Sequence, residues 1–255
     1  MSLITHSVGS VVERVDVSAY QIPTATDQES DGTLAWDSTG VVVVEVHADG
    51  HTGLGYTYGH PAAAQVIESK LASVIEGADA MMPERCWAQM EVQSRQLGHA
   101  GIAAMAISAV DVALWDLKAR LLGVCLADAL PRFHEHVPIY GSGGFCNYSS
   151  EHLQAQIREW VSAGFRSVKI KVGRDKTADL ARIDEARSAG GPNVELMVDG
   201  NGAYALSDAL DWAVRFRERG VSYFEEPLSS QDLAGLAELR RRAPAGLAVA
   251  AGEYG

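Results

Sequence analysis

The sequence lacks the features that mark several specialised classes of protein. It has no run of about 18 apolar residues free of charge, the length that a membrane-spanning helix needs. Its three cysteines, Cys86, Cys125 and Cys146, are too few and too far apart for a disulfide framework or a zinc site. Basic residues are in deficit, with 21 Lys and Arg against 33 Asp and Glu, so the formal net charge is −12. These observations argue against a membrane protein, a disulfide-rich domain and a nucleic-acid-binding protein.

The amino-terminal stretch "MSLITHSVGS" also lacks the basic start and apolar core of a signal peptide. Because the cysteines fit incidental thiols in a reducing compartment, we expect a cytoplasmic protein. The composition, with 47% hydrophobic and 21% charged residues, is ordinary for a globular chain. A length of 255 residues suffices for one large domain or two smaller ones.

Residues 1–130 predict an α+β domain. Strand patterns occupy 10–20 and 40–59, and the second contains an Asp-Gly turn. The stretch between them, 23–40, is rich in Gly, Ser, Thr and Asp and predicts a mobile loop. The last of the helical patterns that follow is apolar nearly all round and is expected to be buried. These patterns lie at 61–78, 83–97 and 101–122.

Residues 131–255 change to a repeating βα pattern. Short apolar strands alternate with amphipathic helices, which predicts a parallel sheet of the TIM-barrel type. The strands are expected at 137–144, 167–173, 195–201, 223–227 and 247–253, and the helices at 151–163, 176–189, 206–219 and 230–242. Since such a barrel has eight strands and about five are present, we expect a barrel domain that is incomplete at its carboxyl end and part of a larger protein.

Polar residues recur in step with this repeat. The intervals are 28 residues from Lys171 to Asp199, 26 from Asp199 to Glu225 and 28 from Glu225 to Glu253. We expect each to lie at the carboxyl end of its strand, and those ends line the active-site mouth of a (β/α) barrel. The spacing therefore predicts a ring of charged side chains.

The strand pattern "SVKIKVG", residues 167–173, places two lysines on one face. Side chains alternate along a strand, so Lys169 and Lys171 point to the same side, opposite Val168 and Ile170. Taken alone, the lysines would fit an exposed edge strand, each carboxylate would fit a solvated loop, and one lysine could form a Schiff base. The shared spacing favours a common site instead. Glu226 has the opposite parity and is not expected to be a ligand.

Three carboxylates in one site repel one another unless a cation lies among them. Oxygen ligands without histidine or thiolate suit Mg²⁺, or Mn²⁺ as a substitute. Such a metal stabilises the charge that develops when a proton leaves the carbon beside a substrate carboxylate. A neighbouring ammonium and a nearby divalent cation both lower the pKa of a lysine, which favours the neutral amine that a base requires. The pattern predicts Lys171 as the base and Lys169 as a contact of the substrate carboxylate.

Several short motifs resemble the enolase superfamily, and within it the mandelate racemase and muconate-lactonizing branch. The family is an established case of a lysine base working with Mg²⁺. The matching stretches are "DVALWDLKARLLG" at 111–123, "YGSGG" at 140–144, "KIK" at 169–171, "VDGN" at 198–201, "FEEP" at 224–227 and "GE" at 252–253. Each motif is weak alone, but together they occur in order and in register with the barrel period.

The resemblance implies an α+β capping domain before the barrel, with the loop near 22–40 closing over the substrate. It implies Mg²⁺ ligation by Asp199, Glu225 and Glu253, and it gives Lys171 the role of base and Lys169 that of an assisting residue. Asn201 and Ser142 would contact the substrate. A glutamate as third ligand resembles the mandelate racemase subgroup more closely.

The substrate would be a small carboxylic acid, and the reaction is left open. Abstraction of the proton through an enolate intermediate would give racemisation or epimerisation. The alternatives are dehydration of a hydroxy or sugar acid, and a non-catalytic protein that keeps the fold. The acid or base on the opposite face of the substrate would lie on later strands, beyond Gly255. An exposed apolar face on the capping domain would be a natural contact between copies, so we expect a homo-oligomer.

Overall fold

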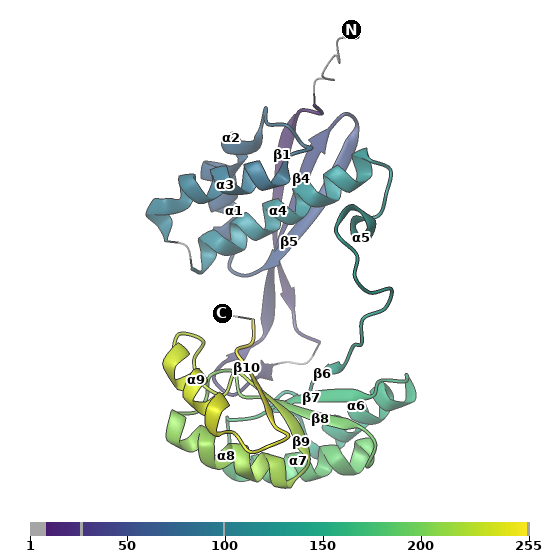
Figure 1. Cartoon of the computed structure of the whole chain (residues 1–255), viewed down its shortest axis with the longest axis vertical. Helices are drawn as coiled ribbons and strands as arrows, with labels where there is room; N and C mark the ends of the chain where they lie inside the picture. Colours follow the sequence, from purple (N-terminus) through teal and green to yellow (C-terminus); the bar gives the residue numbers. More distant parts are fainter. Residues whose placement is uncertain (1–8, 26–27, 99, 254–255) are drawn as a thin grey trace. The chain divides into compact units, whose positions relative to one another are not determined.

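The structure is a computed structural model that describes residues 9–25, 28–98 and 100–253. Helices and strands fill most of these ranges (Figure 1). Within them, no helix combines the length and the apolar character needed to cross a bilayer.

The chain divides into two compact units. The first contains Ser38–Glu135 and the residues up to Pro23, and the second contains Thr24–Asp37 and the residues from His136 onward. The division thus falls a few residues after the predicted boundary at 130. The short segment Thr24–Asp37, which precedes most of the first unit in the sequence, groups with the second unit.

The first unit has the α+β composition that the sequence predicts. Its antiparallel sheet has the order β1-β4-β5, formed by β1 (Arg14–Pro23), β4 (Ser38–Ala48) and β5 (His51–Tyr58). The turn between β4 and β5 has positive φ angles of 47° at Asp49 and 73° at Gly50, as short hairpin turns require. The helical segments are α1 (Ala62–Val66), a π-helical turn (Ile67–Leu71), α2 (Ala72–Ile75), α3 (Pro83–Ser94), a 3₁₀ turn (Arg95–Leu97), α4 (Ile102–Leu121) and α5 (Leu126–Ala129).

Helix α4 packs closely on this sheet because β5 carries two glycines. A Cβ atom at Gly53 or Gly55 would collide with the carbonyl oxygens of Ala113 and Ala109 on α4. The prediction that α4 is buried all round is only half right. Its sheet-facing side is fully buried, but Ile102 and other apolar residues of the opposite side keep about two fifths of their surface exposed, with a value of 41% for Ile102.

The polar stretch 23–40 is more ordered than the predicted loop. It contains two short strands, β2 (Glu29–Ser30) and β3 (Ala35–Trp36), which pair in an antiparallel hairpin. Residues 26 and 27 of the predicted loop lie outside the described residues.

The second unit is a parallel sheet with strand order β10-β9-β8-β7-β6. A helix follows each of the first four strands, so the βα repeat and the barrel-type fold predicted from the sequence are confirmed. The strands are β6 (Gly141–Gly143), β7 (Ser167–Lys171), β8 (Glu195–Asp199), β9 (Val221–Glu225) and β10 (Ala248–Ala250), and the helices are α6 (Ser150–Ser162), α7 (Lys176–Gly190), α8 (Leu206–Glu218) and α9 (Leu233–Arg242).

The two faces of this sheet differ sharply in character. Val168, Ile170, Val198 and Phe224 are fully buried in the apolar core of the second unit. Because side chains alternate along a strand, the residues between them point to the other face. This alternation places the lysines of β7 on the inner face of the sheet.

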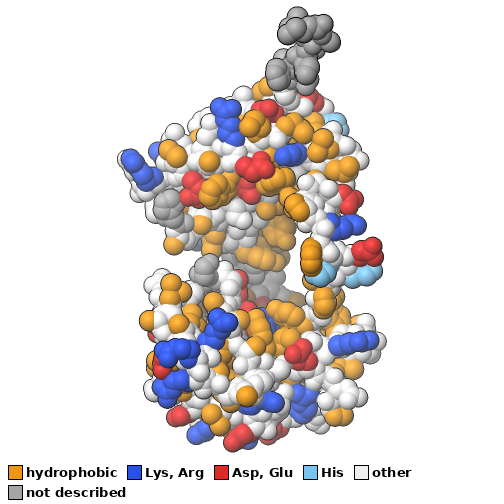
Figure 2. Space-filling model, viewed as in Figure 1, with side chains coloured by type: hydrophobic (Ala, Val, Ile, Leu, Met, Phe, Trp, Pro, Cys, Tyr) orange, Lys and Arg blue, Asp and Glu red, His pale blue; other side chains and the backbone are white. Residues whose placement is uncertain are grey.

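The basic side chains of the second unit lie largely on its helices. Arg240, Arg241 and Arg242 occupy the last turn of α9, where cations interact favourably with the helix dipole. On the face shown in Figure 2, basic side chains are interspersed with apolar and acidic ones.

Helix α6 begins at a capping serine whose removal should have a measurable cost. The Ser149 hydroxyl accepts a hydrogen bond from the backbone N–H of His152 at 3.2 Å. We expect Ser149→Ala to lower the free energy of unfolding by about 1 kcal/mol, the usual cost of losing an N-cap. Urea unfolding measures this, and Ser149→Asp, which can still cap, should keep most of the stability. Equal loss in both variants would contradict the capping role.

Candidate functional site

The ends of three neighbouring strands bring four of the predicted site residues together. Lys171 on β7 pairs with Asp199 on β8, and Asp199 pairs with Glu225 on β9, so the three lie side by side across the sheet. Lys169 lies two residues earlier on β7 and on the same face. The cluster follows directly from the parallel register of the strands.

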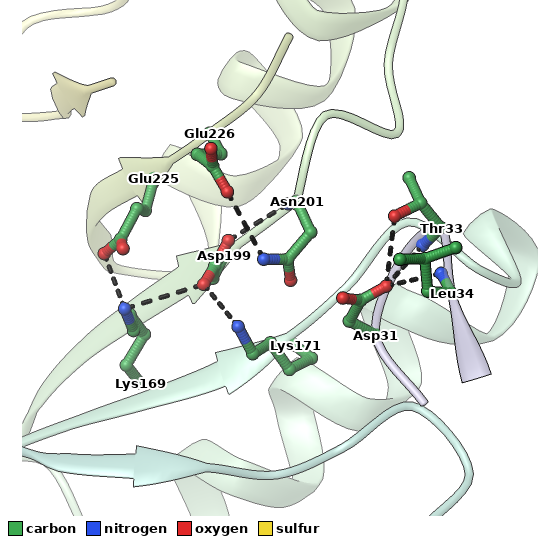
Figure 3. Close-up of polar contacts among 9 residues, drawn as sticks. All are labelled: Asp31, Thr33, Leu34, Lys169, Lys171, Asp199, Asn201, Glu225 and Glu226. Atoms are coloured by element: carbon green, nitrogen blue, oxygen red, sulfur yellow. Dashed lines mark hydrogen bonds and ion pairs between the residues drawn. The ribbon is translucent and has the colours of Figure 1, made fainter. Parts of the chain in front are cut away.

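Within this cluster each lysine donates a hydrogen bond to a carboxylate (Figure 3). Lys169 Nζ lies 2.6 Å from Glu225 Oε2 and 3.6 Å from Asp199 Oδ2. Lys171 Nζ lies 2.6 Å from Asp199 Oδ2. The side chains are 1% exposed at Asp199, 7–8% at Lys169 and Glu225, and 15% at Lys171. Such deeply buried charges are tolerated only when they are paired.

The electrostatics of Lys169 favour its charged form. Burial lowers the pKa of this ammonium, but the hydrogen bond with Glu225 and the charges of Asp199 and Glu225 raise it further, so the net shift is upward. The Tyr140 ring lies 5.3 Å from Lys169 Nζ and adds a cation–π contact. These contacts favour the charged form of Lys169.

Asn201 stands just after β8 and presents an unused acceptor. Its backbone has a φ of 47°, and its N–H donates to Asp199 Oδ1 at 3.0 Å. Its side-chain Nδ2 donates to Glu226 Oε2 at 3.4 Å. The Oδ1 atom is buried and has no hydrogen-bond partner among the described residues. A buried acceptor without a partner is costly, so this oxygen is available to a donor group of a ligand.

Glu226 was not expected to be a metal ligand, and it lies beside Asn201 at the site (Figure 3). Its φ of 38° departs from strand geometry, so the period-two argument fails at this residue. Glu226 is 3% exposed, and its N–H donates to the carbonyl of Ala250. Burial, followed by the charges of Glu253 and Asp199, raises the pKa of its carboxyl to about 7. The repeated acid in "FEEP" was the only signal in the sequence.

Glu253 does not occupy the position that the repeat predicts. Strand β10 ends at Ala250, the register partner of Glu225, so Glu253 lies three residues beyond the strand. Gly252 has a φ of 75° and lies against the Glu226 side chain, and Glu253 is exposed. The charge of Glu253 still acts on Glu226. Among residues 9–25, 28–98 and 100–253, no three His, Cys, Asp or Glu side chains lie close enough together to hold a metal ion.

The remaining predicted contact, Ser142, lies on β6. It pairs in register with Lys169 and is exposed. Ser142 therefore lies two residues closer to the amino-terminal ends of the strands than Lys171 and Asp199.

Asp31 is a second residue that the sequence did not single out. It lies in the hairpin of β2 and β3, is 8% exposed, and appears beside Lys171 and Asn201 in Figure 3. The resemblance implied that the loop near 22–40 closes over the substrate, but no local sequence pattern singled out Asp31 within it.

The donor set of the cluster fits a hard divalent cation in chemical type. Asp199 and Glu225 supply carboxylate oxygens from adjacent strand ends, and no histidine or thiolate stands among the described residues that contact them. Together with the α+β unit, the parallel barrel-type sheet is the fold of an enolase-type protein.

Two family models match the chain. "Mandelate racemase / muconate lactonizing enzyme, N-terminal domain" covers residues 18–130, and "Enolase C-terminal domain-like" covers residues 152–255. The chain belongs to the mandelate racemase/muconate lactonizing enzyme family of the enolase superfamily, as the motifs had suggested.

Curated relatives of the chain are cycloisomerases and dehydratases. The 3,6-anhydro-alpha-L-galactonate cycloisomerase of Streptomyces coelicolor is 33% identical over 249 residues, which are 95% of this chain and 68% of that protein. The L-talarate/galactarate dehydratase of Salmonella typhimurium is 28% identical over 242 residues, which are 91% of this chain and 61% of that protein. The chain thus spans about two thirds of the length of these relatives.

Solved structures agree with this assignment. A mandelate racemase/muconate lactonizing enzyme-like protein from Rubrobacter xylanophilus has 56% identity and a TM-score of 0.93, over 96% of this chain and 68% of that one. A racemase from Streptomyces coelicolor with bound magnesium has 33% identity and a TM-score of 0.84, over 94% of this chain and 69% of that one.

Proposed function

We propose that this chain takes part in the Mg²⁺-dependent removal of a proton from the carbon beside a carboxylate, through an enolate, with racemisation or epimerisation as the outcome. The observation that carries the proposal is the pairing of Lys169 and Lys171 with Glu225 and Asp199 at adjacent strand ends, at 2.6 Å in each case. A pair of lysines beside two carboxylates supplies both a cation and a base to one small site.

Asp199 and Glu225 would hold the metal, and Glu253 is the proposed third ligand. Glu253 would have to approach from the segment after β10, where it is exposed. When bound, Mg²⁺ would supply Lewis-acid stabilisation of the negative charge that develops on the substrate carboxylate.

The chain's own residues would divide the remaining tasks. Lys171, the more exposed lysine, would take the α-proton on its Nζ as a neutral amine. Lys169, whose ammonium is favoured by its surroundings, would hold the substrate carboxylate. Asn201 Oδ1, buried and without a partner among the described residues, would accept a hydrogen bond from a substrate hydroxyl, and Ser142 would contribute a further polar contact.

Dehydration of a hydroxy or sugar acid is the second candidate reaction. The names of the relatives support it, because galactonate, talarate and galactarate are sugar acids and one relative is a dehydratase. Removal of the α-proton is the first step of both reactions, so the same lysines would serve either one. The substrate class that we propose is therefore a small carboxylic acid with hydroxyl groups.

We also propose that the protein works in the cytoplasm and as a homo-oligomer. The three cysteines form no disulfide, which suits a reducing compartment. Strand β5 exposes Leu54, Tyr56 and Tyr58, with 49–65% of their surface accessible, and a second copy could cover such residues.

Proton exchange with solvent tests the proposed function. The protein is incubated with Mg²⁺ in deuterated water with a panel of α-hydroxy acids, sugar acids and N-acyl amino acids. We expect deuterium at the α-carbon of at least one acid, loss of the exchange with EDTA, and recovery when Mg²⁺ is restored. Mass spectrometry measures the label. No exchange with any acid, together with no Mg²⁺ binding by calorimetry, would contradict the proposal.

A further inference from the structure

The segment of residues 28–36, which we call the β2–β3 hairpin, is a small structure within the second unit. Its two strands have two residues each. Its turn is closed by Asp31 Oδ1, which accepts hydrogen bonds from the N–H groups of Thr33 and Leu34, each at 2.7 Å. A hairpin this short is not stable by itself, so contacts with the rest of the second unit must hold it.

The tip of the hairpin rests on the strand ends that carry the site. A Cβ atom at Gly32 would collide with the carbonyl oxygen of Gly200 and would lie 2.6 Å from that of Val172. These two residues directly follow Asp199 and Lys171. The backbone of the hairpin therefore forms part of the wall of the site, and its position decides how much space a substrate finds there.

The Asn147 side chain connects the β2 strand to the loop after β6. Asn147 Oδ1 accepts hydrogen bonds from the backbone N–H of Ser30 at 2.9 Å and from its hydroxyl at 3.3 Å. Asn147 Nδ2 donates to the carbonyl of Gln28 at 2.7 Å. The N–H of Cys146 donates to the Ser30 carbonyl at 2.7 Å. Since Ser30 is only 2% exposed, its two donors depend on Asn147 for a partner.

The β3 strand is held by different contacts. Arg174 Nη1 donates to the carbonyl of Leu34 at 3.1 Å, and the Trp36 ring meets the Phe145 ring edge-on at 5.5 Å. Neither contact involves the hydrogen-bonding groups of Gln28 or Ser30. Loss of the Asn147 side chain would thus remove its three hydrogen bonds to Gln28 and Ser30 and loosen β2, whereas the bond from the Cys146 N–H to the Ser30 carbonyl and the contacts of β3 remain.

From this arrangement we infer that Asn147 is a positioning residue: its amide holds the β2–β3 hairpin against the ends of β7 and β8, and thereby fixes the wall of the substrate site beside Lys171 and Asn201. The effect on catalysis rests on the proposed function, whereas the effect on the hairpin does not. Asn147 contacts neither the proposed metal ligands nor the lysines, so it acts only through the hairpin.

Asn147→Ala tests the inference by two independent readings. We expect the amides of residues 28–36 to exchange with deuterated water about tenfold faster, since hydrogen bonds of ordinary strength are lost. We expect kcat/KM for the acid found by the exchange panel to fall about tenfold or more, mainly through a higher KM, because a displaced wall weakens substrate positioning. Mg²⁺ affinity should stay within about twofold, since no proposed ligand is touched.

Two further variants serve as controls. Asn193 is an exposed asparagine in the turn before β8, and Asn193→Ala should change neither reading. Asn147→Asp keeps the acceptor for Ser30 but loses the donor to Gln28, so it should give an intermediate result in both readings. If Asn147 only stabilised the fold, the free energy of unfolding of Asn147→Ala would instead fall in proportion to its loss of kcat/KM.

Unchanged amide exchange of residues 28–36 in Asn147→Ala would overturn the inference, and so would faster exchange with an unaltered kcat/KM. If the unsubstituted protein labels no acid, the proposed function fails. The amide exchange alone then still decides whether Asn147 holds the hairpin.

Discussion

Lys171→Ala should abolish α-proton exchange. General bases contribute roughly 10²- to 10⁴-fold to rate, so we expect the exchange rate to fall by at least about 10²-fold. Lys171 is 15% exposed and pairs with one carboxylate, Asp199, whereas Lys169 is 7% exposed and lies within 4 Å of both Asp199 and Glu225, so Lys169 is not expected to take its place. Mass spectrometry of the labelled acid measures the rate.

The matched control is Lys70→Ala, which removes an exposed lysine of the first unit. It should leave the exchange rate unchanged. Mg²⁺ binding to Lys171→Ala should persist, because both proposed carboxylate ligands on β8 and β9 remain. Exchange at the full rate in Lys171→Ala would exclude this lysine as the base and would direct attention to another group.

Glu225→Gln should lose both Mg²⁺ binding and a large part of the protein's stability. The substitution leaves the ammonium of Lys169, which is 7% exposed, without its nearest partner. Removing one member of a buried ion pair typically costs about 3–5 kcal/mol, and the remaining contact of Lys169 with Asp199 at 3.6 Å places the expected loss near the lower end. Urea unfolding in EDTA measures the effect without any contribution from metal.

A second substitution separates the buried charge from other causes. Lys169→Met in the Glu225→Gln background removes the unpaired ammonium and should recover more than half of the lost stability, because apolar replacements of buried pairs are often neutral. Glu159→Gln, at an exposed position of α6, should change stability by less than about 0.5 kcal/mol. No recovery in the double variant would mean that the pair is not the source of the loss.

Local periodicity explains why so much of the second unit could be predicted from the sequence. The alternation around Val168 and Ile170 depends only on the pleat of a strand, and the parallel register then sets Lys171 beside Asp199. Helix α7, predicted at 176–189, spans Lys176–Gly190. When strands and helices repeat in a regular order, few positions in the fold are open to the residues at the strand ends.

Departures from periodicity explain what the sequence did not reveal. Glu226 takes a positive φ that turns its carboxyl into the site, against its parity. Glu253 follows the same sequence interval as the other acids, but β10 ends before it. The hairpin that carries Asp31 reaches the strand ends through hydrogen bonds such as that of Ser30 with Asn147, which join residues 117 positions apart in the sequence. Contacts of this kind leave no local pattern.

A crystal structure of the protein with Mn²⁺ and a substrate acid tests the central claim most directly. Anomalous scattering locates the metal without assumptions about its ligands. The account predicts one Mn²⁺ bound by oxygens of Asp199, Glu225 and Glu253, with Lys171 Nζ roughly 3–3.5 Å from the α-carbon of the acid. A metal bound elsewhere, or a Lys171 that points away from the α-carbon, would contradict it.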